Sequence, residues 1–150
     1  MQKDIICKTE KDTAELAHKI AQTAKKGDVF ALCGTLGMGK SVFARAFIQS
    51  LCDVDDVPSP TFTLVQTYPS PKGEIYHFDL YRLKHPDEVF ELGFEDAIYN
   101  GISLIEWPEN AGSWLPKKLI KIKIVSHETG RLFSIENTYD DRYSELENKK

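Results

Sequence analysis

Hydrophobic residues recur with helical spacing in two stretches of the chain. The first stretch has one apolar face, formed by Leu16, Ala17, Ile20, Ala21 and Ala24, as an amphipathic helix does. Asp12-Thr13-Ala14-Glu15 matches a D-x-x-E capping signal and predicts that this helix begins at Asp12. In residues 42–51, apolar side chains cover most of the helix surface. That pattern is typical of a helix pressed against a central sheet.

Short apolar or alternating runs predict strands between and after these helices. The runs lie at residues 4–9, 29–33, 63–68, 74–80, 101–106, 118–125 and 132–136. Turn-rich residues separate the third run from the fourth and the sixth from the seventh, so each of these two pairs is expected to form an antiparallel hairpin. Short helical segments are expected at residues 86–91 and 94–100. The pattern predicts an α/β fold with a sheet flanked by helices.

A glycine-rich segment joins the predicted strand at residues 29–33 to the helix at residues 42–51. Its sequence, Gly34-Thr35-Leu36-Gly37-Met38-Gly39-Lys40-Ser41, matches G-x-x-x-x-G-K-[ST]. Glycines let successive backbone N–H groups turn inward around phosphate oxygens, and the helix N-terminus adds further donors. Lys40 is expected to reach the β and γ phosphates, and Ser41 to bind Mg²⁺. The strand-to-helix context indicates a nucleotide site rather than a chance glycine-rich turn.

Acidic and hydroxyl side chains after other strands are candidates for metal binding and catalysis. The proline-stiffened segment Pro58-Ser59-Pro60-Thr61-Phe62 is either a rigid connector or a GTPase-like switch, in which Thr61 senses Mg²⁺ and the γ-phosphate. Asp79 ends an apolar strand and suits a second Mg²⁺ contact. Glu106 ends another strand and is a candidate to orient or deprotonate an attacking water. Carboxyl ends of parallel strands share one edge, which would bring Gly34, Asp79 and Glu106 together.

Composition limits the possible functions. The chain has 150 residues, of which 41% are hydrophobic and 28% charged, as in one soluble globular domain. No stretch is apolar enough for a membrane span or a signal peptide, so an intracellular protein is expected. The net charge of −4 disfavours a chain that binds nucleic acid alone. Cys7, Cys33 and Cys52 contain no C-x-x-C pair and are interpreted as reduced thiols.

Several residues have less specific interpretations. His77 is interpreted as a core histidine satisfied by the backbone. Arg82 either contacts phosphate or forms a local salt bridge, and Trp107 either packs in the core or contacts a partner or base. None of the four arginines is a clear finger, and no N-K-x-D guanine motif is present. The charged tail at residues 138–150 is expected to be a frayed helix or disordered, after a domain that covers residues 1–137.

Five segments in a fixed order carry a resemblance to a known family. They are the phosphate loop, SPTF at 59–62, HFDLYRL at 77–83, ELGFED at 91–96 and IEWPE at 105–109. This set strongly resembles the TsaE family, from about residue 13 to residue 131. The resemblance implies a P-loop NTPase-like α/β fold with a mixed sheet, ATP and Mg²⁺ as ligands, and slow ATP hydrolysis in the cytoplasm. It also implies action with TsaB and TsaD, which transfer a threonylcarbamoyl group to an adenosine of tRNA, the tRNA being contacted through that complex.

The resemblance further implies roles for individual residues. The implied catalytic residues are Lys40, Asp79 and Glu106. The implied metal ligands are Ser41, Thr61, Asp79 and Glu106. The implied nucleotide-binding residues are Thr13, Thr35, Leu36, Gly37, Met38, Gly39, Lys40, Ser41 and Val42. Ser41 replaces a commoner threonine and Met38 a usual alanine, which makes the loop bulkier.

Two other functions fit the same residues. One is a small-molecule kinase, although no arginine-rich lid segment is evident, and kinases usually need such a lid to exclude water. The other is a nucleotide-dependent binding module that does not need turnover. Phosphate transfer to an acceptor, rather than release of free phosphate, would identify the kinase.

Overall fold

The computed structural model describes residues 2–35, 37–137 and 139–146. Its helices are α1 (Glu10–Thr23), α2 (Lys40–Leu51) and α3 (Phe94–Asn100), with 3₁₀ helices η1 (Pro86–Leu92) and η2 (Pro108–Trp114). Its strands are β1 (Gln2–Cys7), β2 (Val29–Cys33), β3 (Val65–Tyr68), β4 (Ile75–Asp79), β5 (Ile102–Glu106), β6 (Ile120–His127) and β7 (Gly130–Asn137). Among these described residues, no helix is long and apolar enough to cross a membrane.

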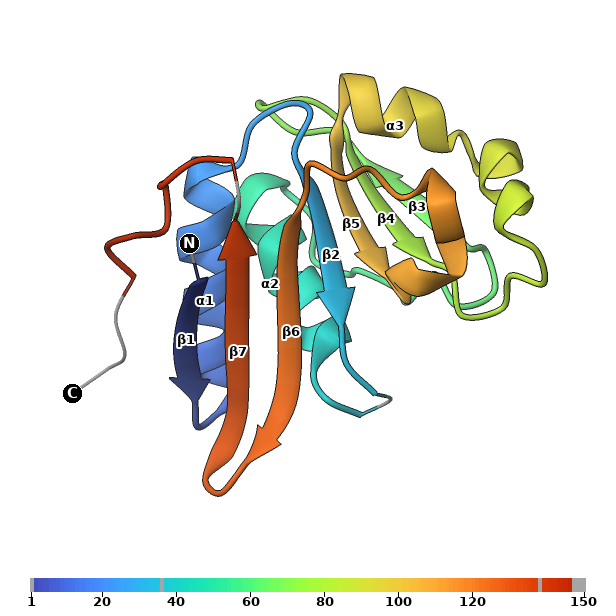
Figure 1. Ribbon diagram of the computed structural model, residues 1–150. Coiled ribbons are helices and arrows are strands. Elements are labelled where there is room, and N and C mark those ends of the chain that lie inside the picture. Colours follow the sequence, from blue (N-terminus) through green and yellow to red (C-terminus); the bar gives the residue numbers. More distant parts are fainter. Residues whose placement is uncertain (1, 36, 138, 147–150) are drawn as a thin grey trace.

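The strands form one mixed sheet in the order β1-β7-β6-β2-β5-β4-β3 (Figure 1). Strand β2 runs parallel to both of its neighbours, β5 and β6, and β4 runs parallel to β5. The two predicted hairpins, β3–β4 and β6–β7, are antiparallel. The predicted α/β fold with a mixed sheet and antiparallel hairpins is therefore confirmed. The parallel strands β2, β4, β5 and β6 all end at the same edge of the sheet.

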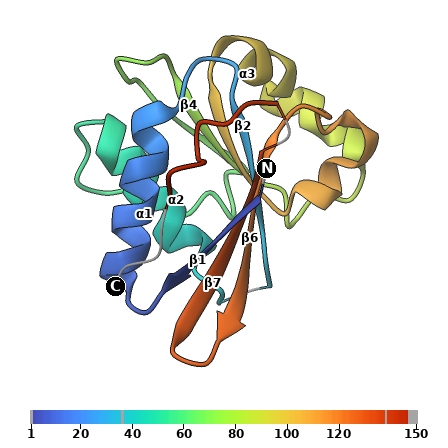
Figure 2. The ribbon, with the colours of Figure 1, turned by 60° about the vertical axis from the view of Figure 1, so that its left-hand side comes forward.

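Helices cover both faces of the sheet. Figure 2 shows α1 and α2 on one face, with α3 and the 3₁₀ helices on the other. On the first face, Phe47 of α2 meets Phe30 of β2 edge to face, with ring centroids 5.1 Å apart. On the second, Phe78 of β4 meets Phe94 of α3 in the same manner at 5.3 Å. Each face thus has an apolar core that holds the sheet edge in place.

Helix α1 begins earlier than its capping signal predicted. The N-cap residue is Thr9, whose hydroxyl accepts a hydrogen bond from the Asp12 backbone N–H at 3.1 Å. The Asp12 carboxylate accepts in return from the backbone N–H of Lys8 at 3.0 Å. The prediction that Asp12 starts the helix is wrong because Asp12 is the acid that completes a cap begun by Thr9.

The C-terminal segment packs against the domain where the structure describes it. Tyr143 is 2% exposed, and the Arg142 guanidinium forms ion pairs with Asp28 and Asp140. The hydrogen bonds from Arg142 hold the pKa of the Asp140 carboxyl well below its usual range. The expectation of a frayed or disordered tail is thus wrong for residues 139–146. Residues 138 and 147–150 lie outside the described residues, and the domain boundary at residue 137 stays a prediction.

We expect Arg142→Gln to lower the free energy of unfolding by about 3 kcal/mol at neutral pH, because it leaves the buried Asp28 carboxylate without its charged partner. Because the pKa of Asp140 is depressed in the folded chain, the ionised carboxylate stabilises the fold. This stabilisation is complete above the unfolded pKa of about 3.9 and is lost as pH falls through the folded value. Urea unfolding at several pH values measures both effects. Arg45→Gln, which changes an exposed arginine of α2, is the control. Equal stability of the two variants at neutral pH would contradict this role of Arg142.

Candidate nucleotide-binding site

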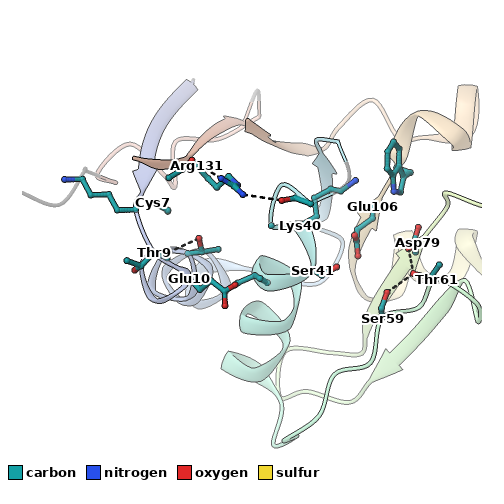
Figure 3. Close-up of a pocket in the computed structure, with 17 residues that line it drawn as sticks. Cys7, Thr9, Glu10, Lys40, Ser41, Ser59, Thr61, Asp79, Glu106 and Arg131 are labelled. Atoms are coloured by element: carbon teal, nitrogen blue, oxygen red, sulfur yellow. Dashed lines mark hydrogen bonds between the residues drawn. The ribbon is translucent and has the colours of Figure 1, made fainter. Parts of the chain in front are cut away.

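A cavity of about 460 Å³ lies at the carboxyl ends of β2, β4 and β5. Its size is within the range of small-molecule pockets. The predicted residues that line it are Thr13, Gly37, Gly39, Lys40, Ser41, Val42, Thr61, Asp79 and Glu106. Figure 3 shows Lys40 and Ser41 in the middle, with Thr61, Asp79 and Glu106 toward one side and Thr9, Glu10 and Arg131 toward the other. The structure therefore brings together residues that are far apart in the sequence.

The phosphate loop has the backbone conformation that its glycines allow. Gly37 and Gly39 have φ angles of 80° and 98°, in the left-handed region that strains other residues. Gly39 is also the N-cap of α2, and as a glycine it has no side chain to cap this helix end. The first N–H groups of α2 thus receive no side-chain cap from Gly39, beside a cavity lined by Lys40, Ser41 and Val42. A helix N-terminus of this kind fits a phosphate group.

Lys40 is held inside the cavity. Its ammonium donates a hydrogen bond to the Gly34 carbonyl at 2.7 Å and lies 3.7 Å from the centre of the Trp107 ring. Burial lowers the pKa of Lys40, while the carboxylates of Glu106 and Asp79 partly oppose that shift. Trp107 has a positive φ of 56°, a strained conformation that is frequent at functional sites. To the two interpretations of Trp107, the structure adds a third, in which the ring covers the phosphate-loop lysine.

The proline-stiffened segment reaches the Asp79 carboxylate. The Thr61 hydroxyl donates to Asp79 Oδ2 at 3.1 Å, and Ser59 Oγ lies 2.8 Å from Thr61 Oγ1. The other carboxylate oxygen, Oδ1, accepts from the Tyr81 backbone N–H at 3.0 Å. Asp79 is only 6% exposed. This contact brings the segment beside the strand-end acid, and its role as a switch stays a prediction.

Glu106 lies beside Asp79 on the neighbouring strand and contacts His77. Asp79 and Glu106 are directly paired between β4 and β5, and Glu106 is 4% exposed. His77 Nε2 lies 2.7 Å from Glu106 Oε2. His77 is buried as predicted, but the expectation that the backbone satisfies it is wrong, because its ring pairs with the Glu106 side chain.

Some predicted residues lie elsewhere. Thr35 and Met38 line a second hollow, which shares Trp107 with the first. Leu36 lies outside the described residues. The Arg82 guanidinium lies 5.0 Å from the Phe62 ring centre, a contact that neither interpretation of Arg82 included.

Sequence reasoning missed the wall that Arg131 forms. Its guanidinium donates to the Gly37 carbonyl at 3.4 Å, and Thr9, Glu10 and Cys7 line the same side of the cavity. Cys7 of β1 pairs with Arg131 of β7. A signal was present at Gly130-Arg131, which open β7 directly after the turn that follows β6. Because β6 runs parallel to β2, that turn lies at the phosphate-loop edge of the sheet.

The oxygen atoms that could bind a metal at this site belong to single side chains and not to a cluster of ligating residues. The described part of the chain contains no group of three or more His, Cys, Asp or Glu side chains that could hold a metal. Mg²⁺ is commonly held by one or two carboxylates together with substrate phosphates. The Ser41 hydroxyl and the Asp79 carboxylate therefore fit Mg²⁺ that arrives with a nucleotide.

Comparison with known proteins gives the family. A family model described as "Threonylcarbamoyl adenosine biosynthesis protein TsaE" matches residues 7–133. The chain belongs to the TsaE family. Its TsaE relatives include proteins named "tRNA threonylcarbamoyladenosine biosynthesis protein TsaE". The one from Rickettsia felis is 44% identical over 133 residues, which are 87% of this chain and 78% of that protein. The one from Bacillus subtilis is 36% identical over 114 residues, 75% of this chain and 71% of that protein.

A solved structure supports the same assignment. The crystal structure of Bacillus subtilis YdiB superimposes with a TM-score of 0.71 and 27% sequence identity, and covers 96% of this chain and 88% of that one. The family description and the names of the relatives place TsaE in the biosynthesis of threonylcarbamoyladenosine in tRNA. The suspected family resemblance is thereby confirmed.

Proposed function

We propose that the chain binds ATP with Mg²⁺ in this cavity and hydrolyses it in support of threonylcarbamoyladenosine formation in tRNA. The observation that carries the proposal is the convergence of Lys40, Ser41, Thr61, Asp79 and Glu106 on one cavity. An ammonium beside an uncapped helix N-terminus suits phosphate. Hydroxyl and carboxylate oxygens suit Mg²⁺. Membership of the TsaE family gives the biosynthetic context.

Each side chain has a defined part in this proposal. Lys40 and the N-terminal backbone of α2 bind phosphate oxygens and stabilise the charge that develops on them. Ser41 and Asp79 would hold the metal, and Thr61 would sense it through its hydrogen bond with Asp79. When bound, Mg²⁺ supplies positive charge that offsets the charge of the phosphate oxygens.

In this proposal, Glu106 is the residue that acts on the attacking water. Its carboxylate faces the same cavity as Lys40, so it can orient a water or accept its proton. Arg131 is the arginine among the described lining residues, and it donates to the Gly37 carbonyl on the side away from Glu106 (Figure 3). Because the described lining residues place no arginine beside Glu106, we infer slow hydrolysis by the chain alone and faster hydrolysis with its partners. We propose TsaB and TsaD as those partners, as the family resemblance implies, with tRNA contacted through their complex in the cytoplasm.

The proposal is tested by phosphate release from ATP. The purified chain is assayed alone and with TsaB, TsaD and tRNA, with Mg²⁺ or with EDTA, and TsaB plus TsaD without this chain is the control. We expect low Mg²⁺-dependent release by the chain alone and a marked increase in the complete mixture. ATP binding without any phosphate release would overturn the hydrolysis. Transfer of phosphate to an acceptor would instead support the kinase.

A further inference from the structure

His77 interrupts an apolar face of the sheet. The residues that share this face alternate as Ile75, His77 and Asp79 on β4, and as Ile102, Leu104 and Glu106 on β5. Ile75, Ile102 and Leu104 are fully buried in the core under α1 and α2. His77 is 2% exposed, so an aliphatic side chain would be the ordinary occupant of its position. A buried imidazole destabilises the fold unless it forms a hydrogen bond.

The hydrogen bond of His77 is made with Glu106, the residue that is proposed to act on the attacking water. Nε2 lies 2.7 Å from Glu106 Oε2, and no described residue bonds to Nδ1. A carboxylate only accepts hydrogen bonds, so Nε2 must carry the hydrogen. The neutral Nε2–H tautomer satisfies this contact and leaves Nδ1 as an acceptor, with no unpaired N–H in the core.

We propose that His77 is a positioning residue for ATP hydrolysis, which fixes Glu106 Oε2 so that the other carboxylate oxygen is presented to the attacking water. This inference rests on the proposed function. Glutamate has several rotatable bonds, and ordering it without a partner is entropically unfavourable. The hydrogen bond from His77 selects one orientation of the carboxylate before the nucleotide binds.

The positioning also keeps Glu106 apart from Lys40. The two side chains line one cavity, and the attraction of the Glu106 carboxylate partly opposes the lowering of the Lys40 pKa by burial. If the Glu106 carboxylate were free to turn and pair with Lys40, Glu106 would no longer contact the attacking water. The Lys40 ammonium would also no longer contact the phosphates. Strand β5, which carries Glu106, lies between β2, which leads to the Lys40 loop, and β4, which carries His77, so the hydrogen bond from His77 opposes that movement.

Replacing His77 tests this role. In the presence of TsaB, TsaD and tRNA, we expect His77→Leu to lower kcat by about 10- to 100-fold, as loss of a supporting hydrogen bond does. KM for ATP should stay close to that of the unaltered chain, because Lys40 and Ser41 are unchanged. His77→Gln retains an N–H donor and should recover much of the lost kcat. His18→Leu, at an exposed position of α1, is the control.

A double variant separates positioning from packing. If His77 acts through Glu106, then His77→Leu should reduce kcat no further in a Glu106→Gln background. Multiplied losses would overturn the inference, as would unchanged kcat in His77→Leu or equal kcat in His77→Leu and His77→Gln. If His77→Leu does not fold, His77→Asn replaces it, because its amide is one methylene shorter than that of Gln. Absence of phosphate release by the unaltered chain would instead overturn the proposed function, and this inference with it.

Discussion

Lys40→Ala is expected to lower the affinity for ATP with Mg²⁺ by about 100-fold. Each hydrogen bond to a charged group contributes about 1.5–3 kcal/mol, and 1.4 kcal/mol corresponds to a tenfold change in affinity. Lys40 is 5% exposed, and its ammonium is already held in the cavity by the Gly34 carbonyl. Truncation therefore removes a preorganised charge from the phosphate side of the site. Calorimetric titration with ATP and Mg²⁺ measures the change.

The control for this variant is another lysine. Lys117→Ala removes an exposed ammonium that does not line the cavity, with the same change in net charge. Its affinity for ATP should match that of the unaltered chain. If Lys40→Ala also binds ATP normally while its thermal unfolding is unchanged, the phosphate loop is not where the nucleotide binds.

Asp79→Asn is expected to reduce Mg²⁺-dependent hydrolysis by about two orders of magnitude, because a metal supplies several kcal/mol of charge stabilisation in the transition state. Asparagine keeps the size of the side chain and one oxygen, which can still accept from Thr61 or from the Tyr81 backbone. The negative charge that holds the metal is lost. The measurement is phosphate release as a function of Mg²⁺ concentration, in which the half-maximal concentration should rise.

An exposed aspartate provides the comparison. Asp53→Asn removes the same charge from the loop after α2 and should leave the Mg²⁺ dependence unchanged. Asp79→Asn with an unaltered Mg²⁺ dependence would show that Asp79 is only a strand-end residue, which accepts from Thr61 without contacting the metal.

The predictable part of this molecule is the part with local signals. Strand β2 matches the predicted bounds, residues 29–33, because an uninterrupted apolar run is bounded by polar and glycine residues. The phosphate loop follows from its motif. Asp79 and Glu106 were expected at one edge because both end strands, and their direct pairing on β4 and β5 confirms that placement. Their catalytic roles remain predictions.

Contacts between distant segments were not predictable in the same way. Arg142 pairs with Asp28, which lies 114 residues earlier, and nothing in the sequence near Arg142 specifies that partner. Arg131 reaches the cavity only because β7 inserts between β1 and β6. His77 and Glu106 meet because their strands are neighbours, so the identity of the His77 partner depended on the strand order. At the start of α1, the Thr9 hydroxyl accepts from the Asp12 backbone N–H and the Asp12 carboxylate accepts from the Lys8 backbone N–H, so the cap lies three residues before the predicted one.

The walls of the cavity come from segments spread between Cys7 and Arg131, and this has a thermodynamic consequence. Partial unfolding of either end of that span removes part of the site, so a nucleotide that binds there binds the complete fold and not the open forms. By mass action, a ligand at 100 times its Kd stabilises such a fold by about 2.7 kcal/mol. Occupancy of the cavity and resistance of the chain to unfolding are therefore linked, and depletion of nucleotide would weaken the domain itself.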